Sequence, residues 1–187
     1  LADLTQADLT QVRLRGATLN QIKLVESKLT GLNLSGVSLI GANLTGSEMT
    51  GATFNGSHLS RAQMSDATLV NAEITGALLN LANLTGANLE GANLAGASFI
   101  GADLTSANLT NSKLVGATLI GANMNGARLL SADLSGTRLL ISELIVSDAR
   151  IDSVLLELNA IQLTALSVDA NLRGVRFDNT TTWPEGR

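Results

Sequence analysis

The sequence predicts a solenoid, a chain that winds repeatedly around one axis, and three observations support this prediction. Every fifth residue from Leu4 to Leu144 is apolar, without a break over 29 positions, of which 23 are Leu. The residue two places before each of them is Ala 19 times and Ser five times. Gly stands two places after them at 16 of the 29 positions.

A five-residue period fits neither regular element. On an α-helix a step of five residues turns about 500°, so successive leucines would spiral around the helix. On a strand the side chains alternate between two faces, so an odd spacing would send successive leucines to opposite sides. The pattern therefore requires a backbone that changes direction once in every five residues and points each leucine at a shared axis.

Each five-residue unit, or pentad, has a predicted role for every position. The apolar central residue and the small residue two places before it are predicted to point inward. The outward residue between them is mostly polar, which gives the alternation of a three-residue strand. Two corner residues follow the central one and turn the chain, because Gly at the second of them tolerates backbone angles that other residues resist.

Several pentads resemble the pentapeptide-repeat proteins, whose consensus is Ala-Asp/Asn-Leu-x-x. Examples are ADLTQ at 2–6, ANLTG at 42–46 and 82–86, and ANLEG at 87–91. The resemblance implies an all-β fold, a right-handed quadrilateral β-helix with four pentads per coil, so that residues 20 apart are stacked. On that basis 29 pentads make about seven regular coils, followed by variant C-terminal coils and a cap.

The C-terminal part departs from the pattern, and we predict a division into residues 1–146, the regular β-helix, and residues 147–187. The segment VLLELNAIQLTALSV at 154–168 fits either a variant coil of the solenoid or a helix. The final DNTTTWPEGR resembles a tail found in bacterial, especially cyanobacterial, members of the family. That resemblance implies a capping tail, in which Trp183 covers the last layer of leucines.

Composition limits the location and the chemistry of the chain. There is no Cys, the formal net charge is −4, and no apolar run is long enough to insert into a membrane. The chain starts at Leu1, inside a repeat, so we expect a processed form, a fragment or a part of something longer. We expect a soluble protein of the bacterial cytoplasm, or of the periplasm or thylakoid lumen if a signal peptide has been removed.

No pattern of catalytic residues is present. His58 is the single histidine and occupies an outward position, and the carboxylates seldom stack on one another at a spacing of 20. The glycines follow the pentad and form no phosphate-binding loop. We therefore predict no enzyme activity, no catalytic residue, no metal site and no cofactor.

Two stacked columns of polar residues are predicted on one face. We interpret the first as a ladder of side-chain hydrogen bonds between coils, formed by Asn43, Gln63, Asn83, Asp103 and Asn123. Beside it stand Thr45, Ser65, Thr85 and Thr105, an arrangement with a distant similarity to flat threonine arrays that bind ice. Ice or small-ligand binding is a minor alternative.

A column of apolar residues is the candidate interaction surface. It consists of Ile100, Ile120 and Leu140, with further apolar surface expected from Leu130, Ile141 and Ile145. Three explanations remain open: residues 147–187 fold back and cover it, a second copy binds there as a homodimer, or a different protein binds there.

The predicted function is a non-catalytic scaffold or protein-interaction module that presents flat faces to an unknown protein partner. The alternative is DNA mimicry, because some quinolone-resistance members of the family resemble duplex DNA and bind DNA gyrase. A rod of roughly 35 Å would then need about twenty negative charges. Residues 1–146 carry ten acidic residues and eight basic ones, which counts against the mimic and equally against a nucleic-acid partner.

Overall fold

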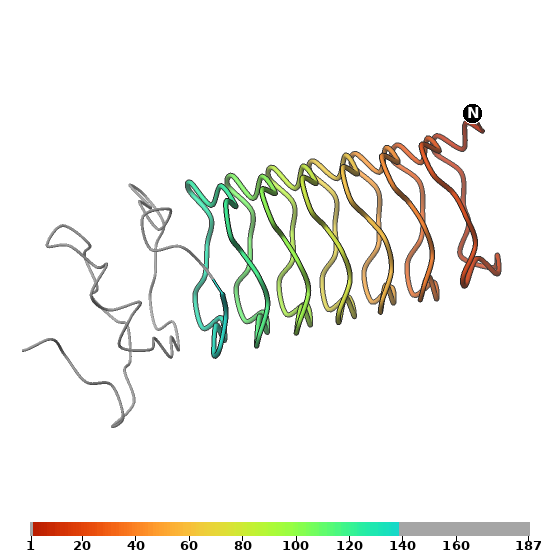
Figure 1. Ribbon diagram of the computed structural model, residues 1–187. Coiled ribbons are helices and arrows are strands. Elements are labelled where there is room, and N and C mark those ends of the chain that lie inside the picture. Colours follow the sequence, from red (N-terminus) through yellow and green to blue (C-terminus); the bar gives the residue numbers. More distant parts are fainter. Residues whose placement is uncertain (1, 139–187) are drawn as a thin grey trace, which may run out of the picture.

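The computed structural model describes residues 2–138, which form one elongated β-helix (Figure 1). The coils follow one another in sequence order along a single axis, from the N-terminal end onward. From Asp3 to Thr118 every outward residue except Arg13 pairs in parallel with the residue 20 positions later, as in the series His58, Leu78, Ser98. A coil is therefore 20 residues, or four pentads, and the expectation that residues 20 apart are stacked is confirmed for the described part of the chain.

The secondary structure of residues 2–138 consists of these single-residue parallel bridges and two-residue turns, without a helix. From the pentad 37–41 to the pentad 112–116, three amides of each pentad donate hydrogen bonds to backbone carbonyls of neighbouring coils. For the pentad centred on Leu84, the bonds are Leu84 N–H to Asp103 O (2.7 Å), Gly86 N–H to Thr105 O (2.8 Å) and Asn83 N–H to Ala62 O (2.9 Å). The stacking of coils is thus held by main-chain bonds that do not depend on the identity of the side chains.

The corners are tight turns with one left-handed residue. The carbonyl of Leu84 accepts a hydrogen bond from the amide of Ala87 (2.9 Å), and the second corner residue between them, Gly86, has φ of 68°. A positive φ at the third residue of a four-residue turn is typical of type II turns and favours Gly. All 16 glycines of the repeat have positive φ, which confirms the predicted reason for their spacing.

The core is a stack of central residues lined by the small residues. Phe54, Phe99 and most of the central leucines are completely buried, as are most of the small-position alanines. Burial of each large apolar side chain contributes about 2 kcal/mol, which makes this column the main source of stability. In the first coil Leu4, Leu14 and Leu19 are only partly buried.

Several predictions fall on residues outside those that the structure describes. These are the division at residue 146, the choice between coil and helix for 154–168, the capping role of Trp183, and the placement of Leu140, Ile141 and Ile145. The number of regular coils beyond residue 138 belongs to the same group.

Candidate interaction surface

The titratable side chains of the described residues lie on the outside of the solenoid and do not gather into a site. His58 is exposed, and no group of three or more His, Asp or Glu within residues 2–138 is placed to hold a metal ion. One ion pair is present in this part of the chain, between Lys23 Nζ and Asp3 Oδ2 at 3.4 Å, and both side chains are about half exposed. An exposed pair of this kind contributes little to stability.

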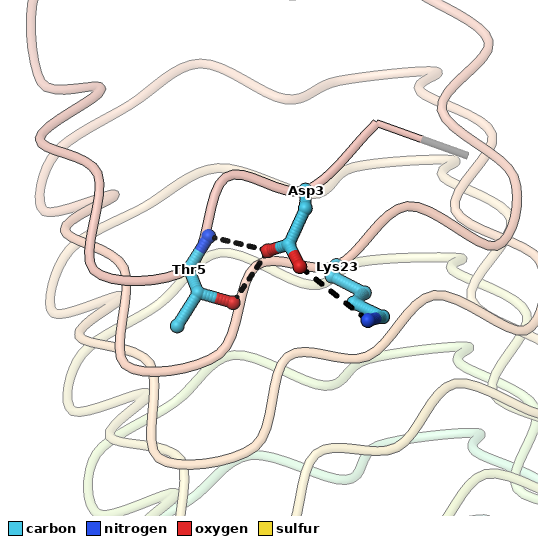
Figure 2. A network of polar contacts seen from close by, with 3 residues as sticks. All are labelled: Asp3, Thr5 and Lys23. Atoms are coloured by element: carbon cyan, nitrogen blue, oxygen red, sulfur yellow. Dashed lines mark hydrogen bonds and ion pairs between the residues drawn. The ribbon is translucent and has the colours of Figure 1, made fainter.

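Asp3 shows what an outward carboxylate does in this fold (Figure 2). Its Oδ1 accepts hydrogen bonds from the hydroxyl of Thr5 (2.6 Å) and from the amide of Thr5 (3.1 Å). These bonds lower the pKa of Asp3, with a smaller contribution from Lys23. Asp8 and Thr10 repeat the arrangement one pentad later, where the hydroxyl and amide of Thr10 lower the pKa of Asp8. The carboxylate therefore satisfies a corner amide that has no backbone partner.

The predicted Asn ladder is only partly present. Within that column the structure has one direct side-chain bond between coils, from Asn83 Nδ2 to Gln63 Oε1 at 3.4 Å. The oxygens of Asn43, Asn83 and Asp103 instead accept the amide two residues later in the same coil, at 3.0–3.1 Å. The short side chain reaches its own corner more easily than the neighbouring coil, so local capping takes most of the acceptors.

Three corner asparagines, Asn20, Asn55 and Asn80, accept an amide of the next coil. Asn80 Oδ1 accepts the amide of Ile100 (3.1 Å) and the hydroxyl of Ser98 (2.6 Å). Asn20 makes the equivalent bonds to Ile40 (3.0 Å) and Ser38 (2.6 Å). These bonds leave the aliphatic side chains of Ile40 and Ile100 at the corner, where they are 38% and 44% exposed.

The 20-residue register places the residues of the predicted apolar surface at two different corners of the solenoid. Ile100 and Ile120 lie in the same column on consecutive coils, as expected, and Ile120 is half-buried. Leu130 is 39% exposed but lies half a coil away, at the opposite corner of the solenoid, because ten residues span two of the four pentads. The expectation that Leu130 extends the surface of Ile100 and Ile120 is therefore wrong.

Leu81 belongs to this surface and was not predicted from the sequence. Its amide donates to the carbonyl of Ile100 (2.9 Å), and at 55% it is the most exposed large apolar side chain of the described residues. It occupies a second corner position with φ of 60°, a conformation that Leu rarely adopts. The available signal was a Leu at a place where Gly or a polar residue is usual.

One wall of the solenoid carries no acidic residue within residues 2–138. We call it the acid-free wall, and it comprises the corner residues on both sides of the following outward residues: Thr18, Ser38, His58, Leu78, Ser98, Thr118 and Arg138. Apart from His58, its charged residues are Arg15, Arg61 and Arg138, all of them exposed. The acidic residues of the described chain all lie elsewhere: Asp3, Asp8, Glu26, Glu48, Asp66, Glu73, Glu90, Asp103 and Asp133.

The middle of the acid-free wall is uncharged and partly apolar. Between Arg61 and Arg138 its outward residues are Leu78, Ser98 and Thr118. The apolar corner, which we define as Leu81, Ile100 and Ile120, borders this stretch on one side, and Val115 (42% exposed) lies on the other. The arrangement offers an apolar contact area between two arginines and lacks any group placed for catalysis.

Comparison with known families gives a match to the model described as pentapeptide repeats. It covers residues 2–46, 19–56, 47–86, 82–119 and 102–139, in eight copies. No curated protein matches the sequence significantly. Within the described residues, no helix is long and apolar enough to cross a membrane.

Two solved structures are similar to this chain. HetL, a pentapeptide repeat protein involved in heterocyst differentiation regulation in the cyanobacterium Nostoc sp. strain PCC 7120, is 35% identical with a TM-score of 0.50. The match covers 73% of this chain and 65% of HetL, so it spans slightly less than two thirds of that protein. QnrB1, a plasmid-mediated fluoroquinolone resistance protein, is 22% identical with a TM-score of 0.55, over 95% of this chain and 90% of QnrB1. These likenesses support the right-handed β-helix.

Proposed function

Because the chain belongs to the pentapeptide-repeat family, we propose that it is a non-catalytic scaffold that binds a partner protein through its acid-free wall. The observation that carries the proposal is the apolar corner, where Leu81 and Ile100 are 55% and 44% exposed. Exposed apolar residues are common singly, but a group of them on a flat surface is typical of contact sites. We propose that the partner binds over the uncharged stretch of the wall around this corner.

The backbone of Leu81 supports the same proposal. A left-handed conformation costs a non-glycine residue about 1–2 kcal/mol, and exposure of the side chain gives back little of that cost. Gly101 occupies the equivalent corner on the following coil, and on the preceding coil this corner is Arg61, whose polar side chain is exposed and whose φ is also positive. A leucine that is both unfavourable for the backbone and exposed is better explained by a contact than by folding.

DNA mimicry is the competing function, and the described charges do not favour it. A mimic needs a dense, one-signed array, because duplex DNA carries one charge per about 1.7 Å. The acidic residues here are interspersed with basic ones, for example Lys23 between Asp3 and Asn43 in one column. The likeness to QnrB1, at 22% identity, supports the fold alone.

Site-specific photo-crosslinking tests the proposed function. A photoreactive amino acid replaces Ile100 on the acid-free wall or, as a matched control, Leu130 at the opposite corner, which has the same pentad position and a similar exposure. In cells of the source organism we expect a discrete crosslinked protein with the probe at position 100 and none with the probe at 130. Identical crosslinking patterns at both positions, or no crosslink at position 100, would contradict the proposal.

A further inference from the structure

The acid-free wall has no free amide in the pentad at its middle, residues 97–101, with which a partner strand could pair. In the pentad 97–101 all five amides are already bonded. Four donate to backbone carbonyls, those of Leu94, Ala77, Thr118 and Ile120, at 2.7–3.0 Å, and the amide of Ile100 donates to Asn80 Oδ1. An extended strand laid on this pentad would find no amide to donate to its carbonyls, and the carbonyls that the wall covers would remain unpaired. A helix avoids this cost because its backbone bonds are internal.

The charges of the wall determine which charge the two ends of such a helix must carry. Arg61 and Arg138 flank the uncharged middle and make no ion pair within the described residues. Residues 2–138 place no carboxylate on this wall to neutralise them, so a partner that brings carboxylates to both ends gains two pairs. A partner with basic ends meets like charge at both places.

The spacing of Arg61 and Arg138 sets the length of the bound helix. Four successive pairings lead from His58, in the same coil as Arg61, to Arg138. At about 4.8 Å per coil the separation is about 19 Å along the axis. A helix rises 1.5 Å per residue, so about 13 residues span the distance.

A second copy of the chain fits this wall poorly. In a symmetric contact the same surface faces itself, so the arginines of one copy meet those of the other whichever way the two rods run. The apolar corner spans only three coils, about 14 Å along the axis. A patch of this length does not by itself supply the roughly 800 Å² per partner that a stable interface buries.

We propose that the acid-free wall binds an amphipathic helical segment of another protein, about 13 residues long, with an apolar stripe that packs on Leu81, Ile100 and Ile120 and carboxylates at both ends that pair with Arg61 and Arg138. The inference rests on the proposed scaffold function and adds the chemistry of the partner. The apolar stripe supplies most of the affinity, and the arginines set the position and exclude basic segments.

Three fluorescent helical peptides of about 16 residues test it by anisotropy. The first has Leu at i, i+3, i+4 and i+7 with Glu at both ends. The second replaces these Glu residues with Lys, and the third replaces the Leu residues with Ser. We expect binding of the first only. L81G and I100S should each weaken it about tenfold, whereas L130S, the matched control, should leave it unchanged.

A charge reversal keeps the test decisive if the apolar variants fold poorly. The double variant R61E/R138E should lose affinity for the Glu peptide by about two- to fivefold per arginine and gain it for the Lys peptide. Equal binding of the Glu and Lys peptides to the unmodified protein would overturn the partner chemistry and leave the scaffold function standing. A crosslink at position 100 without binding of any peptide would do the same.

Two further outcomes would overturn more than the chemistry of the partner. If L81G, I100S and L130S affect binding equally, the wall is not the binding surface and the proposed function fails as well. If sedimentation equilibrium finds the unmodified protein to be a dimer and I100S to be a monomer, a second copy occupies the wall and the helical partner is wrong.

Discussion

The side chain of Leu81 lies against Gly101 of the following coil, so that a Cβ placed on Gly101 would meet Leu81 Cδ2 at 2.8 Å. Gly96, one pentad earlier, has the same backbone conformation, with φ of 65° against 64°, and open space around it. We predict that G96A loses about 1 kcal/mol from its left-handed conformation, and that G101A loses about 1 kcal/mol more because Leu81 must move. Urea denaturation of both variants measures the difference.

The contact itself is tested in the L81G background. There G101A and G96A should cost the same, because the side chain that G101A displaces is gone. If the extra cost of G101A persists without Leu81, the contact is not its cause.

Leu81 is predicted to be dispensable for folding. L81G removes the left-handed strain of a leucine and loses an exposed side chain, so the free energy of unfolding should stay within about 1 kcal/mol of the unmodified protein. L84A, at a fully buried central position, should lose about 3–5 kcal/mol. Thermal and urea unfolding of the two variants compare them. A loss at L81G similar to that at L84A would mean that Leu81 is a structural residue.

Asn80 is predicted to hold the corner that presents Ile100. N80A removes the acceptor of the Ile100 amide and of the Ser98 hydroxyl, and should cost about 1 kcal/mol while hydrogen exchange of the Ile100 amide becomes faster. N80D keeps the side-chain oxygen and should retain slow exchange. Unchanged exchange in N80A would show that the amide has another source of protection.

Thr5, more than Lys23, should control the titration of Asp3. The hydroxyl and amide of Thr5 are the main causes of the lowered pKa of Asp3. T5V, which removes the hydroxyl, should therefore raise this pKa more than K23M does, as measured by NMR of the carboxyl carbon. A larger shift in K23M would reverse the order of causes.

The pH dependence has a defined sign. Because the folded-state pKa of Asp3 is lowered, its contribution to stability is present above the ordinary carboxyl pKa and is lost as the pH falls through the lowered value. T5V should reduce this loss. The side chain is exposed, so the effect on stability is expected to be small.

The sequence predicted the coil and its core, because the five-residue spacing of Leu4 to Leu144 admits few other ways to bury the leucines. It did not reveal Leu81, since a search for apolar residues at the first corner position overlooks a second corner that Gly normally occupies. Closeness in sequence suggests that Leu130 lies near Ile120, whereas the register puts residues ten apart at opposite corners of the coil. The local capping by Asn83 depends on side-chain reach, which the column alone does not show.

The acid-free wall also emerges only from the register. Along the chain the acidic and basic residues are mixed, and the formal net charge of −4 suggests no basic or neutral face. Once residues 20 apart are stacked, Arg61 and Arg138 share a wall from which every carboxylate of residues 2–138 is missing. Charge segregation of this kind is a property of the coil length and is invisible to composition.

Methyl–methyl nuclear Overhauser effects in selectively labelled protein test the central claim, a 20-residue coil that sets Ile100 beside Ile120 and Leu130 opposite them. We predict a cross-peak between the methyl groups of Ile100 and Ile120 and none between Ile120 and Leu130. A cross-peak from Ile120 to Leu130, without one to Ile100, would contradict the coil, the wall and the partner inferred from them.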